Sequence, residues 1–282
     1  MVKLCAGFLR GCGLVLGLVS LAVRAAEPVA PTDDKLELYA CSYGRSRFPE
    51  TSAFRDGRKG EFVEIAWGFY VARSGAEVTL IDTGFNDPAT AKKWWVKMTA
   101  EPAQLLADLK IDPAKVSRVI ITHLHFDHVG NLPLFPKAQV VISRRDRDDY
   151  VNKKPLGGMI YDPRVAEILS DPARTHVIGG REMLSGGFEV EMVGGHTAGS
   201  SVVHLFHQGT HYVLAGDECY LCANQKEQRP IGQTADLKRN IAFLSRIADP
   251  AVIVLPCHDP EIFTKYPAVT PNIVRVFGPK EY

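Results

Sequence analysis

The segment THLHFDHVGN, residues 122–131, constrains this chain more than any other stretch, because it places three histidines and one aspartate within six positions directly after a short apolar run. Side chains alternate along an extended chain, so His123 and His125 point to one side, and Asp127 and His128 turn toward a second point. Neutral imidazoles and carboxylates are ligands of Zn²⁺ and similar cations. A chance cluster of surface histidines would not require the apolar run, so the segment predicts a metal site.

Four other short motifs lie along the chain in a fixed order. Together with the H-x-H-x-D-H pattern they resemble the signature motifs of the metallo-β-lactamase superfamily, and the resemblance covers nearly all of residues 36–260. The four motifs are LIDTG at residues 80–84, GHTAGS at residues 195–200, AGD at residues 215–217 and CHD at residues 257–259.

The resemblance implies an α+β fold, an αβ/βα four-layer sandwich in which two mixed sheets pack together with helices outside. It also implies two divalent cations about 3.5–4 Å apart. The donor types suit Zn²⁺, and they also suit Fe, Co or Mn. By this resemblance, the first cation is held by His123, His125 and His196, the second by Asp127, His128 and His258, and Asp217 bridges both.

Asp82, in the first of these motifs, has two interpretations. By resemblance it accepts a hydrogen bond from a ligand histidine and fixes its tautomer. An aspartate at a strand end also caps turns, and one side chain can serve both purposes.

The chemistry implied by the resemblance is hydrolysis by a hydroxide that bridges the two cations and attacks a carbonyl carbon. Asp127 would accept or relay its proton. Tyr220 stands three residues after Asp217, where it resembles the tyrosine with which N-acyl-homoserine lactonases reach the substrate carbonyl or the leaving oxygen. A phenol there can donate to developing negative charge; the alternative is a tyrosine packed in a loop.

We therefore expect an enzyme that opens lactone rings, foremost those of N-acyl-homoserine lactones. Opening these lactones is called quorum quenching. The alternative is another ester, a thioester or a β-lactam on the same residues. The carboxylate of Asp217 weighs against β-lactams, because β-lactamases of this superfamily typically lack an aspartate there. A redox or non-catalytic metal protein is a further alternative; the retained His125 and the complete ligand set weigh against it.

Five aromatic side chains are candidates to line or cover an apolar acyl pocket, although core packing or a dimer contact is the alternative for each. They are Phe48, Phe69, Phe85, Trp94 and Trp95.

The N-terminal residues have the layout of a secretory signal peptide. A basic start with Lys3 and Arg10 precedes an apolar run of 13 residues and then small residues, which predicts a signal peptide over 1–26. The Pro-rich residues 27–35 read as a tether, and residues 36–282 as one hydrolase domain. We expect a periplasmic or secreted protein that has no membrane segment after cleavage, because spanning a bilayer requires roughly 20 apolar residues.

Charge and cysteine content narrow the partners further. Without residues 1–26 the formal net charge falls from +1 to −2, which argues against nucleic acid as a partner. A small-molecule lactone or ester is therefore the expected partner, and the resemblance raises a homodimer as the assembly to be tested. Cleavage leaves four cysteines, for which a disulfide or simple burial is expected.

The remaining pattern predicts strands that end at each motif and two clear helices. One helix is expected over 102–109, and a second over 236–247, with Leu237, Ile241, Leu244 and Ile247 on its apolar face. The strands are expected over 36–43, 61–73, 77–81, 116–122, 138–143, 188–193, 201–207, 211–215 and 251–255.

Overall fold

The structure is a computed structural model that describes residues 34–154 and 158–279. The predicted signal peptide at 1–26 and most of the predicted tether at 27–35 lie outside the described residues, so these two predictions are not tested by it.

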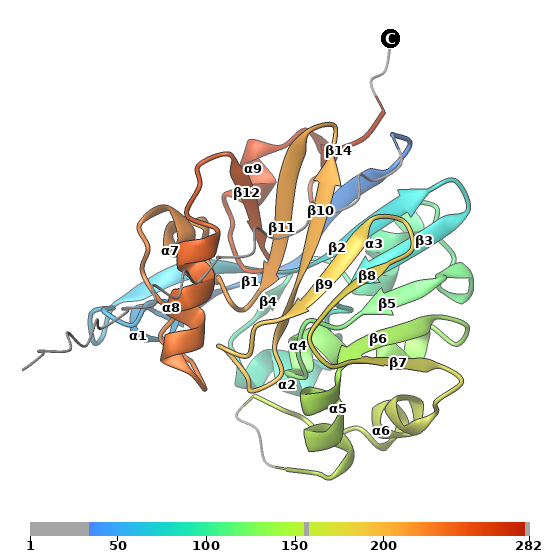
Figure 1. Cartoon of the computed structure of the whole chain (residues 1–282), viewed down its shortest axis with the longest axis horizontal. Helices are drawn as coiled ribbons and strands as arrows, with labels where there is room; N and C mark the ends of the chain where they lie inside the picture. The colour runs from blue at the N-terminus through green and yellow to red at the C-terminus, as the bar shows by residue number, and fades with distance from the viewer. Residues whose placement is uncertain (1–33, 155–157, 280–282) are drawn as a thin grey trace, which may run out of the picture.

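The first sheet has nine strands among the described residues, in the order β13-β14-β1-β2-β3-β5-β6-β7, with β4 paired to β1 (Figure 1). It is mixed: β1, β2 and β3 pair antiparallel, whereas β3, β5, β6 and β7 pair parallel. Its strands are β1 (Glu37–Pro49), β2 (Phe62–Ser74), β3 (Glu77–Ile81), β4 (Lys97–Met98), β5 (Arg118–Ile120), β6 (Gln139–Ser143), β7 (Thr175–Ile178), β13 (Ala268–Thr270) and β14 (Ile273–Phe277).

The second sheet has five strands in this part of the chain, in the order β12-β11-β10-β9-β8. It is also mixed, because β11 and β12 are parallel and the other pairs antiparallel. Its strands are β8 (Arg181–Leu184), β9 (Phe188–Met192), β10 (Ser201–His207), β11 (Thr210–Gly216) and β12 (Val252–Pro256).

Short helices connect and cover the strands. Several begin with a proline in the first turn or with a side-chain cap, such as Ser143 on α5 and Asp236 on α8, and each cap satisfies a backbone N–H group that the helix itself leaves unpaired. The α-helices are α1 (Glu50–Ala53), α2 (Pro88–Lys93), α3 (Pro102–Asp108), α4 (Phe126–Val129), α5 (Arg144–Val151), α6 (Pro163–Ser170), α7 (Cys222–Lys226), α8 (Leu237–Arg246) and α9 (Ile262–Lys265), with 3₁₀ turns at Pro113–Lys115 and Leu132–Leu134.

The core lies in three layers that follow from the two-residue alternation of strand side chains. Ala40 and Tyr70 of the first sheet pack against Val203 and Leu214 of the second, and these residues form the apolar layer between the sheets. Residues of the opposite parity, such as Phe69, pack under the helices that cover the outer face of the first sheet.

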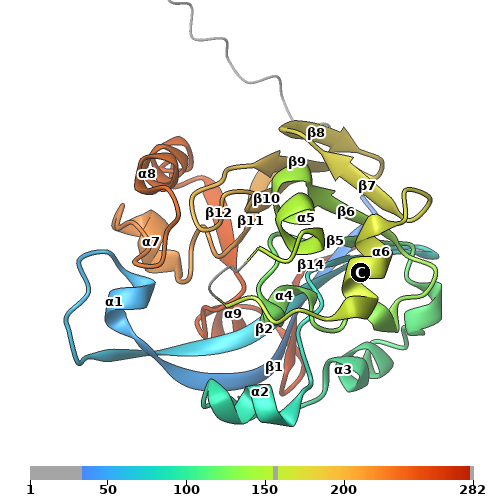
Figure 2. The same cartoon turned by 90° about the horizontal axis from the view of Figure 1, so that it is seen from below.

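Helix α8 covers the outer face of the second sheet, where its Phe243 and Leu244 contact Val202 and Val213 (Figure 2). The order of layers is therefore helices, sheet, sheet, helix. This confirms the predicted four-layer sandwich of two mixed sheets.

The buried face of α8 differs from the predicted one. Its buried residues are Asn240, Phe243, Leu244 and the following Ile247, whereas the side chain of Ile241 is 45% exposed. Residues 240, 243, 244 and 247 have the i, i+3, i+4, i+7 spacing of one helical face. The prediction was wrong at Ile241 because the face begins at a polar residue, Asn240, which hydropathy alone does not select.

Within the described residues, none of the helices combines the length and the apolar character that crossing a lipid bilayer requires.

Candidate metal centre

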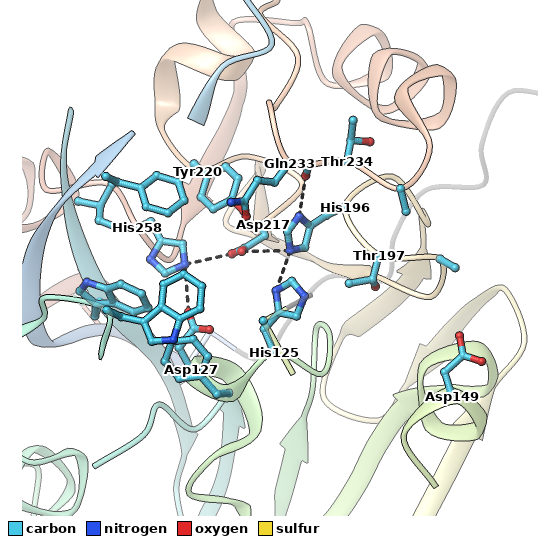
Figure 3. Close-up of a pocket in the computed structure, with 18 of the residues that line it drawn as sticks. His125, Asp127, Asp149, His196, Thr197, Asp217, Tyr220, Gln233, Thr234 and His258 are labelled. Atoms are coloured by element: carbon cyan, nitrogen blue, oxygen red, sulfur yellow. Dashed lines mark hydrogen bonds and ion pairs between the residues drawn. The ribbon is translucent and has the colours of Figure 1, made fainter. Parts of the chain in front are cut away.

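The motif residues meet where strands from both sheets end (Figure 3). The segment with His123 follows β5 of the first sheet, and His196 follows β9 of the second. Asp217 comes directly after β11, and His258 comes two residues after β12. Each of these polar residues follows the end of a buried apolar strand, and for this reason it lies inside the protein.

One group of four potential ligands consists of His123, His125, His196 and Asp217, whose ligand atoms all lie within 4.8 Å of one another. The Nε2 atom of His196 is 3.1 Å from Nδ1 of His125. The Oδ2 atom of Asp217 is 3.3 Å from Nε2 of His196 and 3.6 Å from Nε2 of His123.

A second group consists of Asp127, His128 and His258. The Oδ2 atom of Asp127 lies 3.2 Å from Nε2 of His128 and 3.3 Å from Nε2 of His258. The Oδ1 atom of Asp217 faces the same two nitrogens, at 3.2 and 3.1 Å. Asp217 therefore directs one oxygen toward each group, which is the geometry of a bridging carboxylate. All seven predicted ligands are brought together.

Hydrogen bonds behind the rings set which ring nitrogen faces the centre. Nδ1 of His196 donates to the carbonyl oxygen of Gln233 and Nδ1 of His258 to that of Ala66, both at 2.9 Å. Since a carbonyl oxygen only accepts, each Nδ1 carries a proton, and Nε2 is the ring nitrogen that faces the centre.

Asp82 performs the same function for His128. Its Oδ2 atom accepts from Nδ1 of His128 at 2.8 Å, and its Oδ1 atom accepts from the backbone N–H of Thr122 at 2.8 Å. The carboxylate thus holds the proposed ligand histidine and the end of β5 together, as the first interpretation predicts, and its backbone contact is with Thr122 rather than with its own turn. Thr122 Oγ1 donates to Asp82 Oδ2 at 2.9 Å and is 3.2 Å from Nδ1 of His123, which places that ring in the same network.

The arrangement fits cations. Among the described residues, the buried atoms His123 Nε2, His128 Nε2 and Asp217 Oδ1 have no hydrogen-bond partner. Buried polar atoms are rarely left unpaired, and here lone-pair nitrogens face carboxylate oxygens, which a positive ion between them would satisfy. Histidine and carboxylate donors suit Zn²⁺ as well as Fe, Co and Mn. Burial raises the pKa of the Cys257 thiol, whose Sγ atom donates to Oδ2 of Asp82 at 3.7 Å.

The electrostatics favour positive charge at the centre. Burial lowers the pKa of His125 to about 3, which keeps this ring neutral as a ligand must be. Burial would also lower the pKa of His258, but the carboxylates of Asp217 and Asp127 outweigh it and raise that pKa to about 10.

Tyr220 lies at the edge of this centre, buried against aromatic rings. Its ring centroid is 5.2 Å from that of Phe48 and 5.6 Å from that of His258, and its hydroxyl donates to Oε1 of Gln233 at 3.2 Å. Burial, with the nearby carboxylates of Asp217 and Asp127, raises the pKa of the phenol well above its usual value. The hydroxyl therefore stays protonated and is a hydrogen-bond donor.

A cavity of about 500 Å³ opens over the ligands and over Tyr220 (Figure 3). Its lining includes both apolar and polar side chains. The apolar side chains include Phe48, Ile65, Trp67, Trp94 and Phe126, and the polar side chains include Arg145, Asp149, Thr197, Gln233 and Thr234.

Two of the five aromatic pocket candidates, Phe48 and Trp94, line this cavity. The other three do not. Phe69 is core, Phe85 lines a neighbouring cavity, and the side chain of Trp95 is 82% exposed.

The four other histidines, His176, His204, His207 and His211, are not among these two ligand groups. His204 sits between Glu191 and His211, at 3.0 Å from each, and His207 stacks on Phe277. His176 is paired with Glu182 at 2.6 Å.

The described cysteines are all free and buried, so burial rather than a disulfide accounts for them: Cys41, Cys219, Cys222 and Cys257.

Comparison with known proteins places the chain among metal-dependent hydrolases. Residues 69–258 match the sequence profile described as the metallo-beta-lactamase superfamily. A relative named a probable metallo-hydrolase, from Mycobacterium bovis, is 22% identical in an alignment of 231 positions that covers 66% of this chain and 72% of the relative.

Solved structures agree with the observed fold. The crystal structure of a quorum-quenching N-acyl homoserine lactone lactonase superposes with a TM-score of 0.71 at 18% identity, covering 88% of this chain and all of that one. A dizinc quorum-quenching lactonase, solved with its product N-hexanoyl-L-homoserine, gives 0.63 at 17% identity, covering 91% and 99%. At such identities the likeness establishes the fold.

Proposed function

The chain belongs to the metallo-beta-lactamase superfamily and is a metal-dependent hydrolase, and from this premise we propose that it opens lactone rings, with N-acyl-homoserine lactones as its principal substrates. The seven clustered side chains are the proposed ligands of two divalent cations, and we propose that these cations are Zn²⁺. The observation that carries the choice of substrate is the hydroxyl of Tyr220 beside the bridging Asp217, in a cavity lined by both apolar and polar side chains.

Bound in this centre, two divalent cations would supply Lewis acidity and lower the pKa of a water toward neutrality. Asp127 is buried between His128 and His258, and as a carboxylate near the reacting water it is placed to accept a proton. Tyr220, kept protonated, is placed to donate to the oxygen on which negative charge develops when a carbonyl is attacked.

The cavity supports a substrate with an apolar tail and a small polar head. Apolar side chains line part of it, and a volume of about 500 Å³ is typical of a small-molecule site. A lactone head near the ligands and an acyl chain along the apolar side chains would match this lining.

Substrates that carry a free carboxylate fit less well. The one Lys or Arg side chain among the described residues that line the cavity is Arg145, and its guanidinium is already paired with Asp149 at 2.8 Å. β-Lactams and glutathione thioesters both carry carboxylates, which favour an unpaired cation in the site.

A panel of substrates tests the proposal. Proton release would be followed at constant pH with acyl-homoserine lactones of several chain lengths, simple γ- and δ-lactones, a thioester and a β-lactam. We expect the highest kcat/KM for an acyl-homoserine lactone. If a thioester or a β-lactam were turned over faster than every lactone, the proposal would be wrong, and hydrolysis of that substrate at the same centre would take its place.

A further inference from the structure

A second buried carboxylate lies directly beside the metal centre, on Glu218, the neighbour of the bridging Asp217. Glu218 is fully buried. Its Oε1 atom accepts the backbone N–H groups of Gly195 and His196 at 2.8 and 2.9 Å and the hydroxyl of Ser200 at 2.5 Å. One oxygen therefore ties both ends of the loop that carries His196.

The loop is packed against this carboxylate with no spare space. A Cβ atom added to Gly195 would lie 2.3 Å from Oε2 of Glu218 and 2.9 Å from Cβ of Asn240. Glycine is therefore needed at 195, so that the backbone can approach the carboxylate closely enough to donate to it. Hydrogen bonds to an ionised acceptor are about twice as strong as neutral ones, which makes this contact a firm anchor for the backbone of His196.

The other oxygen of Glu218 is held by Asn240 of α8. The side-chain amide of Asn240 donates to Oε2 at 2.9 Å and to the backbone oxygen of Glu218 at 3.0 Å. Its Oδ1 atom accepts the backbone N–H of Ile231 at 3.1 Å, which fixes the orientation of the amide. In the described part of the chain Glu218 has no ion pair with a Lys or Arg, and its carboxyl oxygens are held by hydrogen-bond donors.

We propose that Glu218, held by Asn240, is a positioning residue that fixes the backbone of His196 so that Nε2 of this ligand stays aimed at the cation. This inference rests on the proposed metal centre and extends it. A ligand must stay within about 0.5 Å of its productive position to bind well, and Glu218 restrains His196 at its own N–H group, 2.9 Å away. Glu218 touches no reacting atom and acts through His196.

The donor and acceptor pattern gives a specific test. Glu218→Gln places an amide N–H₂ group against the N–H₂ group of Asn240, so two donors face each other. Asn240→Asp places two carboxylates side by side. The double variant Glu218→Gln/Asn240→Asp restores one donor and one acceptor between the two side chains and has the net charge of the wild type, but it lacks the donation from residue 240 to the backbone oxygen of Glu218.

Zinc affinity is measured on the full-length protein after removal of metal, by competition with a chromophoric chelator. We expect Glu218→Gln to weaken zinc binding by about 10- to 100-fold, the usual effect of losing a residue that supports a ligand. We expect the double variant to recover part of that loss, because only the contact between the two side chains is restored. Ser200→Ala, which removes one donor to Oε1, should weaken binding by a smaller factor and serves if Glu218→Gln does not fold.

Controls separate positioning from general stability. Glu189→Gln changes a carboxylate that pairs with Arg181 far from the centre and should leave zinc affinity unchanged. The melting temperature of each metal-free variant is recorded in parallel. A Glu218→Gln protein that melts lower but binds zinc as tightly as the wild type would overturn the positioning role. A wild-type protein that binds no zinc would instead refute the metal centre itself.

Discussion

At the scale of single residues, Gln233 contacts both a proposed metal ligand and the proposed hydrogen-bond donor of the site. Its backbone oxygen accepts from Nδ1 of His196, a proposed ligand, and its side-chain oxygen accepts from the hydroxyl of Tyr220. Its own backbone N–H donates to the carbonyl of Ser52, which fixes the segment from outside. One residue thus sets the tautomer of a ligand and the direction of a donor.

Removal of the Tyr220 hydroxyl tests the proposed donor. We expect Tyr220→Phe to lower kcat for lactone opening by roughly 100-fold, near the lower end of the range for loss of one donor to a developing oxyanion. Metal content, measured by elemental analysis, should not change, because the phenol is not one of the seven proposed ligands. Tyr39→Phe is the matched control, since that hydroxyl donates to Glu37 outside the cavity. An unchanged rate for every lactone would make Tyr220 a packing residue.

Gln233→Ala extends the same prediction. It removes the acceptor of the Tyr220 hydroxyl but keeps the backbone oxygen that orients His196. We expect a smaller loss of kcat than in Tyr220→Phe, and little additional loss when the two changes are combined, because contacting residues are not additive. Fully additive losses would show that Gln233 acts independently of the tyrosine.

At the scale of secondary-structure elements, α8 combines two functions on one face. Phe243 and Leu244 cover the second sheet, while Asn240 on the same face holds Glu218. Packing of the helix and the position of the His196 loop are therefore linked through a single rigid element.

One phenylalanine and one isoleucine on α8 test which face of the helix is buried. Phe243 is fully buried, so Phe243→Ala should lower the free energy of unfolding by about 3–5 kcal/mol, the usual cost of this truncation in a core. Ile241 is 45% exposed, and Ile241→Ala should cost well under 1 kcal/mol. Urea unfolding followed by circular dichroism measures both. Equal losses would support the apolar face predicted from hydropathy instead.

The sequence predicts the ligands well because each motif is short and stands at the end of an apolar strand. His123 and His125 can be recognised from their own neighbours in the chain. Glu218 and Gln233 cannot, because their partners lie 22 and 37 residues away and come from irregular segments with no periodicity. Trp95 shows the opposite error, since an aromatic residue next to a lining residue, Trp94, is itself exposed.

At the scale of the whole molecule, the proposed export would depend on residues 1–26 and is tested separately from the fold. When the full-length chain is expressed in a bacterium, we expect mature protein in the periplasmic fraction whose N-terminus is residue 26 or 27, read by N-terminal sequencing. Leu16→Lys interrupts the apolar run and should leave uncleaved protein in the cytoplasm. Wild-type protein found in the cytoplasm with Met1 or Val2 at its start would rule out a cleaved signal peptide.

The two sheets meet at the candidate metal centre, and this gives the cations a structural role as well as a chemical one. His123, His125, Asp127 and His128 follow the end of the first sheet, whereas His196, Asp217 and His258 follow strands of the second. A cation held by both sets is bound only when the sheets are packed together. It therefore binds the folded chain in preference to the unfolded chain, and such binding stabilises the fold.

Metal removal should accordingly lower the melting temperature. Zinc at 100 times its dissociation constant adds about 2.7 kcal/mol, which for a domain of this size corresponds to roughly 5–10 °C. Calorimetry of the metal-free protein with and without zinc measures the shift. Asp217→Ala should lose most of it, because its two oxygens face the two ligand groups. His204→Gln, whose side chain bonds to Glu191 away from the centre, should retain it. A wild-type protein that melts at one temperature regardless of zinc would show that the sheets are not connected through the cations.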